Sequence, residues 1–126
     1  MERGGVDEGT VVKNLLKETE RALAVWGKSG SDARWVGSSD GTYGMTWDEF
    51  KSLADQEYDD NYCDPQVATD LVIVGDGWWL ERWEFGGTEG WTYKTRPTLL
   101  WKSKPITRVI VTAENPYDNT LKEMNP

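Results

Sequence analysis

Carboxylates are the side chains of this sequence best able to do chemistry, and they gather in one segment. Residues 48–64 hold seven acids against one lysine: Asp48, Glu49, Asp55, Glu57, Asp59, Asp60 and Asp64. Close-set oxygen ligands suit calcium, but an EF-hand loop counted from Asp55 needs glycine at its sixth position and glutamate at its twelfth. Asp60 and Gln66 stand there instead. We therefore expect no metal site and interpret the segment as a negative surface for a basic partner. A solvated loop is the simpler alternative.

Paired carboxylates could also catalyse glycoside hydrolysis, and Glu81, Glu84 and Glu89 lie among tryptophans. No spacing fixes them as a pair, however, and the chain has no histidine to serve as a general base. Gly-Lys-Ser at residues 27–29 lacks the upstream glycine of a phosphate-binding loop. We expect no catalytic residue, no cofactor and no enzymatic activity. A carbohydrate-active or metal-dependent hydrolase is the remaining enzyme alternative.

Aromatic side chains form the second notable group, with eight tryptophans in the chain. In a strand over 78–85, alternation places Trp79 and Trp83 on one face and Trp78 on the other. One face should pack against helices. The other is either a cross-strand cluster that shields the sheet or an exposed patch that anchors a partner. We take Trp83 and Trp91 as candidate anchors, because tryptophan is common at binding hot spots.

The elements that position these residues follow from local patterns. Apolar spacing predicts a helix over 11–26 that Thr10 caps and Gly27 ends. A second helix is predicted over 47–58, where Thr46 and Glu49 form a capping box. An irregular acidic loop should follow over 59–69.

Strand patterns dominate the rest of the chain. We predict strands over 34–37, 70–74, 78–85, 91–95 and 106–113, with a hairpin loop over 86–90. Pro97 should end the fourth of these strands or place it at an edge of the sheet. The fold class is therefore predicted as α+β, with two helices packed on a small antiparallel meander of three to five strands.

Length and charge limit the number of domains and the classes of partner that the chain can have. The chain has 126 residues and a mass of 14.3 kDa, which predicts a single domain over 1–126 with flexible ends at 1–9 and 115–126. Its net charge of -8 is concentrated in residues 32–89, which hold fourteen acids and three bases. Direct binding to nucleic acid or to an anionic membrane is therefore not expected. The basic stretch 94–108 is interpreted as an internal counter-charge or a self-association surface.

Cellular location is indicated by what the sequence lacks. Cys63 is the single cysteine, so no internal disulfide can form. The first residues include no apolar signal-peptide core, and the longest aliphatic run is the four residues 71–74. These features predict a soluble intracellular protein.

The central block resembles a set of small uncharacterised bacteriophage and prophage proteins. The likeness rests on TWDEFxxLADxEYD at residues 46–59, DLVIV at 70–74 and DGWWLER at 76–82. It covers about residues 46–95. The chain departs from those proteins at Trp78, which replaces a small residue, and in its hairpin, which lacks their aspartate. The resemblance implies a phage setting and, with it, the host cytoplasm, and it carries no catalytic residue over.

Small acidic phage proteins without catalytic groups are often inhibitors of host proteins. The expected function is therefore anti-CRISPR-like: stoichiometric binding to a host nucleic-acid-handling defence protein, with the acidic segment acting as a nucleic-acid mimic. The alternative is a phage structural or regulatory protein that self-assembles through a tryptophan-rich sheet. Both interpretations are compatible with a homodimer.

Overall fold

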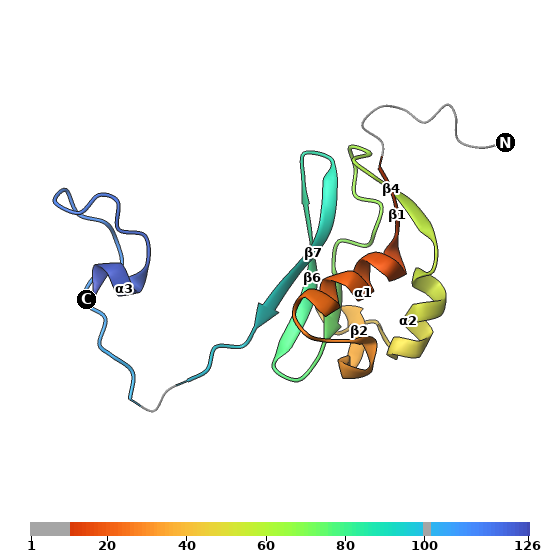
Figure 1. Cartoon of the computed structure of the whole chain (residues 1–126), viewed down its shortest axis with the longest axis horizontal. Helices are drawn as coiled ribbons and strands as arrows, with labels where there is room; N and C mark the ends of the chain where they lie inside the picture. Colours follow the sequence, from red (N-terminus) through yellow and green to blue (C-terminus); the bar gives the residue numbers. More distant parts are fainter. Residues whose placement is uncertain (1–10, 100–101) are drawn as a thin grey trace. The chain divides into compact units, whose positions relative to one another are not determined.

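The computed structural model describes residues 11–99 and 102–126. The chain divides between Arg96 and Pro97 into two compact units. The first unit holds both sheets and the two longer helices (Figure 1). None of the helices in the described part of the chain is long and apolar enough to cross a membrane.

The main sheet of the first unit has five antiparallel strands in the order β3-β2-β5-β6-β7 (Figure 1). Their bounds are Gly44–Met45 for β3, Trp35–Ser38 for β2, Leu71–Val74 for β5, Trp78–Phe85 for β6 and Thr88–Thr95 for β7. Strands β5, β6 and β7 form the predicted meander. The predicted α+β class with an antiparallel sheet is therefore confirmed.

The two helices pack on one face of this sheet and close the core. Helix α1 (Leu15–Val25) contributes Leu23, and helix α2 (Trp47–Ala54) contributes Phe50 and Ala54. The sheet contributes Val36, Ile73, Trp78 and Leu80. The alternation predicted for β6 thus holds, because Trp78 and Leu80 face the helices and are buried.

The predicted first helix begins too early. Residues Val11–Asn14 form strand β1, and Asn14 caps α1 by accepting a hydrogen bond from the Lys17 amide at 2.9 Å. Thr10, the predicted cap, lies outside the described residues. Two adjacent valines favour a strand, and the Asn14 side chain satisfies the helix terminus that Thr10 was expected to satisfy.

The predicted second helix ends too late. Its capping box is confirmed, since the Glu49 amide donates to Thr46 Oγ1 at 3.1 Å. Helix α2 nevertheless stops at Ala54, and Glu57–Asp60 form strand β4, which pairs antiparallel with β1 in a separate two-stranded sheet. Pairing with a distant strand overrode the helical spacing, so the loop predicted from residue 59 starts with strand residues instead.

The connections of the first unit follow their turn residues. Gly27 has a φ of +71° and ends α1 as predicted, and a short 3₁₀ helix, η1 (Gly30–Asp32), lies in the loop that follows. The β6–β7 hairpin is tighter than predicted. Only Gly86 and Gly87, both with positive φ, separate the two strands. Strand β7 ends at Thr95, two residues before Pro97, as predicted.

The second unit, residues 97–126, differs from the prediction. The strand predicted over 106–113 is absent, and 102–126 contain one short helix, α3 (Leu121–Met124). The Asn125 side chain accepts the amides of Thr107 and Arg108 at 2.8 and 3.0 Å. These two amides are therefore satisfied by a side chain, and residues 102–126 contain no strand that could pair with the β-branched run that follows. The segment 115–126, predicted as a flexible tail, contains this helix.

Candidate partner-binding surface

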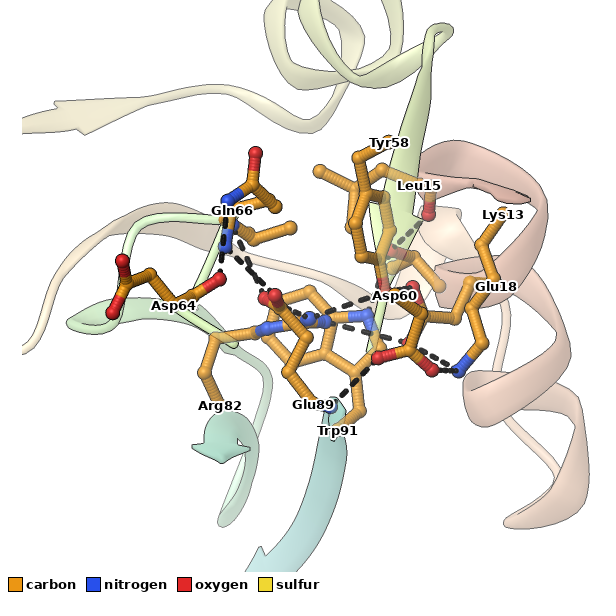
Figure 2. A network of polar contacts seen from close by, with 12 residues as sticks. Lys13, Leu15, Glu18, Tyr58, Asp60, Asp64, Gln66, Arg82, Glu89 and Trp91 are labelled. Carbon is orange, nitrogen blue, oxygen red and sulfur yellow. Dashed lines mark hydrogen bonds and ion pairs between the residues drawn. The ribbon is translucent and has the colours of Figure 1, made fainter. Parts of the chain in front are cut away.

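A buried ionic network lies where β1, α1, β4, β6 and β7 meet (Figure 2). The Arg82 side chain is only 3% exposed, and its Nη2 lies 3.0 Å from Glu89 Oε1. Its Nη1 lies 3.5 Å from Glu18 Oε2. The guanidinium also stacks against the Trp91 ring, with 4.7 Å between Arg82 Cζ and the ring centroid. Arg82 therefore pairs with carboxylates from two separate elements.

Asp60 and Glu89 extend this network to the loop that follows β4. Asp60 Oδ2 pairs with Lys13 Nζ at 2.9 Å, and Asp60 Oδ1 accepts the Glu89 amide at 2.8 Å. The Glu89 carboxylate accepts the amides of Gln66 and Val67 at 2.7 and 3.1 Å. These bonds tie the acidic segment to β7. Neither Asp60 nor Glu89 is available on the surface.

The network changes the protonation of two of its members. Burial of Asp60 acts to raise its pKa, but hydrogen bonds from Lys13 and the Glu89 amide outweigh burial and hold the pKa below its usual value. Burial and the hydrogen bond that Tyr58 Oη donates to Glu18, at 2.7 Å, raise the pKa of Tyr58. The network thus favours a charged Asp60 and a neutral Tyr58.

The other predicted acids lie on the surface of α2, β4 and the following loop. Asp48 is exposed in the first turn of α2, where Glu49 also accepts the Thr46 amide at 2.9 Å. Asp55 accepts a hydrogen bond from the Asn14 side chain at 3.0 Å. The remaining three are Glu57 and Asp59 on β4 and the exposed Asp64. The structure therefore exposes five of the seven predicted acids, leaves Asp59 half-buried and buries Asp60.

A groove of about 700 Å³ with a mixed polar and apolar lining lies beside these acids. Met45, Phe50, Leu53 and Leu71 contribute its apolar lining, and Glu57 and Asp59 also line it. We call the exposed acids together with this groove the acidic groove surface. Sequence reasoning missed the groove because it extended the second helix over residues 57–58, which lie on β4 and line the groove. Leu53 is 61% exposed and lines the groove as well.

The two predicted tryptophan anchors lie on opposite faces of the sheet. Trp91 faces the helices, is half-buried, and donates from Nε1 to Thr19 Oγ1 at 2.9 Å. Trp83 faces away from the helices and is 42% exposed. It lies against Gly90, and Phe85 on the same face is 81% exposed. Trp83 thus shields the sheet backbone and also contributes to an exposed apolar face.

Comparisons with known proteins add no family or function to this geometry, because no family model, curated protein or solved structure matches the chain. In the described part of the chain, no group of three or more acids, cysteines or histidines is arranged to hold a metal ion. The geometry therefore combines negative charge with a groove of mixed polar and apolar lining.

Proposed function

We propose that this protein is an acidic, stoichiometric inhibitor that binds the nucleic-acid-binding surface of a host defence protein. A CRISPR effector is the partner of first interest, and a phage origin with action in the host cytoplasm belongs to the same proposal. The observation that carries it is the acidic groove surface, where Glu57 and Asp59 of β4 line a groove whose apolar side chains include Phe50 and Leu53 of α2.

Charge and groove have different roles in this proposal. Proteins that handle nucleic acid expose basic grooves, and exposed carboxylates can occupy them in place of phosphates and steer the approach. Charged surface groups raise the rate of association and the selectivity for a partner more than they raise the affinity. The apolar side chains of the groove offer a place where a side chain of the partner is desolvated, as at binding hot spots.

A pull-down from a bacterial lysate that contains assembled CRISPR complexes tests the proposal. The immobilised protein is eluted with a salt gradient, and the eluate is identified by mass spectrometry. Stoichiometric recovery of a nucleic-acid-binding protein at moderate salt is expected, because exposed ion pairs are screened by salt. Recovery of the bait alone would oppose the proposal.

The exposed apolar face of the sheet favours a second candidate function, self-assembly. Trp83 and Phe85 are both exposed on that face, and exposed aromatic patches often mark interfaces. This function predicts a concentration-dependent oligomer and no host partner. Light scattering over a concentration series distinguishes the two candidates, since an assembly module must grow with concentration and an inhibitor need not.

A further inference from the structure

Strand β7 forms one edge of the five-stranded sheet and pairs only with β6. Two hydrogen bonds fix the direction of its backbone groups. The Arg96 amide donates to the Gly77 carbonyl on the β6 side, whereas the Glu89 amide donates to Asp60 on the opposite side. Backbone groups alternate in direction along a strand. The odd-numbered residues of β7 therefore direct their amides and carbonyls away from the sheet.

Three of these residues leave the edge open. Trp91, Tyr93 and Thr95 have outward backbone groups that make no hydrogen bond with any described residue. Only the start of β7 is covered, by the contact that Asp60 makes with Glu89. An open edge of this length is a template for a further strand.

A groove of about 440 Å³ lies next to this edge, between α1 and β7. Val25 of α1 is 71% exposed and lines the groove together with the half-buried Trp91. Lys17 and Arg21, one turn apart on the same side of α1, line it as well. A strand added to β7 would therefore place alternate side chains against α1.

The charge of this groove is opposite to that of the whole chain. Lys13 and Glu18, which also line it, are already ion-paired within the buried network. Lys17 and Arg21 are exposed and make no ion pair with any residue that the structure describes. The net charge of the protein is -8, yet the unneutralised charge at this groove is positive.

We infer that β7 and α1 form a binding site for an extended acidic peptide of a partner protein, which adds to β7 as a sixth strand. Backbone hydrogen bonds to Trp91, Tyr93 and Thr95 supply affinity, as in other cases of strand addition. Apolar side chains of the peptide pack on Val25 and Trp91, and acidic ones reach Lys17 and Arg21. This site adjoins the acidic groove surface at Val12, which lines both grooves, but it does not depend on the proposed function.

The probe for this site is a fluorescent octapeptide of alternating glutamate and valine, titrated into the full-length protein at low salt. Nuclear magnetic resonance follows the amides during the titration. Binding should slow hydrogen exchange at Trp91, Tyr93 and Thr95 and leave the amides of β3, at the far edge of the sheet, unchanged. The same peptide N-methylated at alternate residues should bind at least tenfold more weakly, because it cannot donate along one edge.

Charge variants give a second readout. Lys17→Gln combined with Arg21→Gln should weaken peptide binding about tenfold, a magnitude typical of two exposed ion pairs. The control combines Lys51→Gln with Lys122→Gln, which removes the same charge from exposed residues of α2 and α3. That control should bind the peptide within about twofold of the unchanged protein.

Three results would overturn the inference. The first is failure of the peptide to bind the folded protein. The second is equal binding of the N-methylated peptide, or of a lysine–valine peptide of the same length. The third is a dimer in the free protein whose Trp91, Tyr93 and Thr95 amides are already protected, because a second copy would then occupy the edge.

Discussion

At the scale of single residues, the account depends on Arg82. Its buried side chain compensates carboxylates on two elements, Glu18 and Glu89. Removal of one partner from a buried pair leaves an uncompensated charge in the interior, which costs far more than loss of an exposed pair. The Lys94–Glu81 pair provides the comparison, since it lies in the same hairpin at 3.7 Å with both side chains over one third exposed.

We therefore predict different effects for two matched substitutions. Arg82→Met should lower the free energy of unfolding by about 3–5 kcal/mol. Lys94→Met should lower it by about 1 kcal/mol or less. Urea denaturation at pH 7 measures both values. If the two variants lose similar amounts of stability, the network does not hold the acidic segment as described.

Asp60 gives a prediction about pH. Its pKa is lower in the folded protein than in the unfolded chain, so its contribution to stability is complete above the unfolded value of about 3.9. That contribution is lost as the pH falls from there through the lowered folded pKa. Asp60→Asn should therefore destabilise the protein at pH 7. The difference in free energy of unfolding between this variant and the unchanged protein should become smaller at pH 3.

Denaturant unfolding of both proteins at the two pH values gives the comparison. Asp59→Asn serves as a control, because Asp59 lies beside Asp60 on β4 but outside the buried network. Its effect on stability should be small at both pH values. If the loss in free energy of unfolding caused by Asp60→Asn is the same at pH 7 and pH 3, the assigned role of this carboxylate is contradicted.

At the scale of elements, local signals were readable from the sequence and distant pairings were not. The start of α2 was predicted because Thr46 and Glu49 lie within one turn of each other. Strands β5 and β6 were predicted because composition and alternation are properties of the strand itself. The pairing of β1 with β4 joins segments far apart in the chain. No local pattern in either segment identifies the other as its pairing partner.

The same distinction explains the second unit and the candidate site. Residues 106–113 have strand composition, but no strand forms there. The capping box of α3, from Thr120 to Glu123, was present in the sequence and was overlooked. At the site, the exposed acids could be predicted from charge density alone. Burial of Asp60 could not, because it depends on the position of Lys13 after β1 and β4 pair.

The β6–β7 hairpin allows a test of one turn. Gly86 has a φ of +61°, and a side chain added there would meet no atom within 4 Å. Backbone conformation alone should therefore decide the effect of a substitution. Gly86→Asn should be tolerated, whereas Gly86→Val should cost about 1–2 kcal/mol more. Thermal unfolding compares them, and equal stability of the two variants would show that the turn has a different conformation.

At the scale of the whole molecule, the uneven distribution of charge distinguishes this protein. The acidic groove surface carries exposed carboxylates, whereas the groove beside β7 is lined by unneutralised basic residues. The effect of a charge-reversal substitution on partner binding should therefore depend on where the substituted residue lies. Asp60 is unsuitable for this test, because its reversal would disrupt the buried pair with Lys13.

A matched pair of triple variants separates position from total charge. The first reverses three acids at the acidic groove surface, Glu57→Lys, Asp59→Lys and Asp64→Lys. The second reverses three exposed acids elsewhere, Asp76→Lys, Glu84→Lys and Glu114→Lys. Each changes the net charge equally. We predict that the first set weakens binding to a basic partner at least tenfold and that the second set changes it by about threefold or less.

The most direct test of the central claim is a competition measurement on the partner that the pull-down recovers. Fluorescence anisotropy follows the partner bound to its labelled nucleic acid while the unchanged protein or either triple variant is added. The account predicts that the unchanged protein and the second variant displace the nucleic acid at a one-to-one ratio, and that the first variant does not. Equal displacement by all three proteins, or binding that leaves the nucleic acid in place, would contradict it.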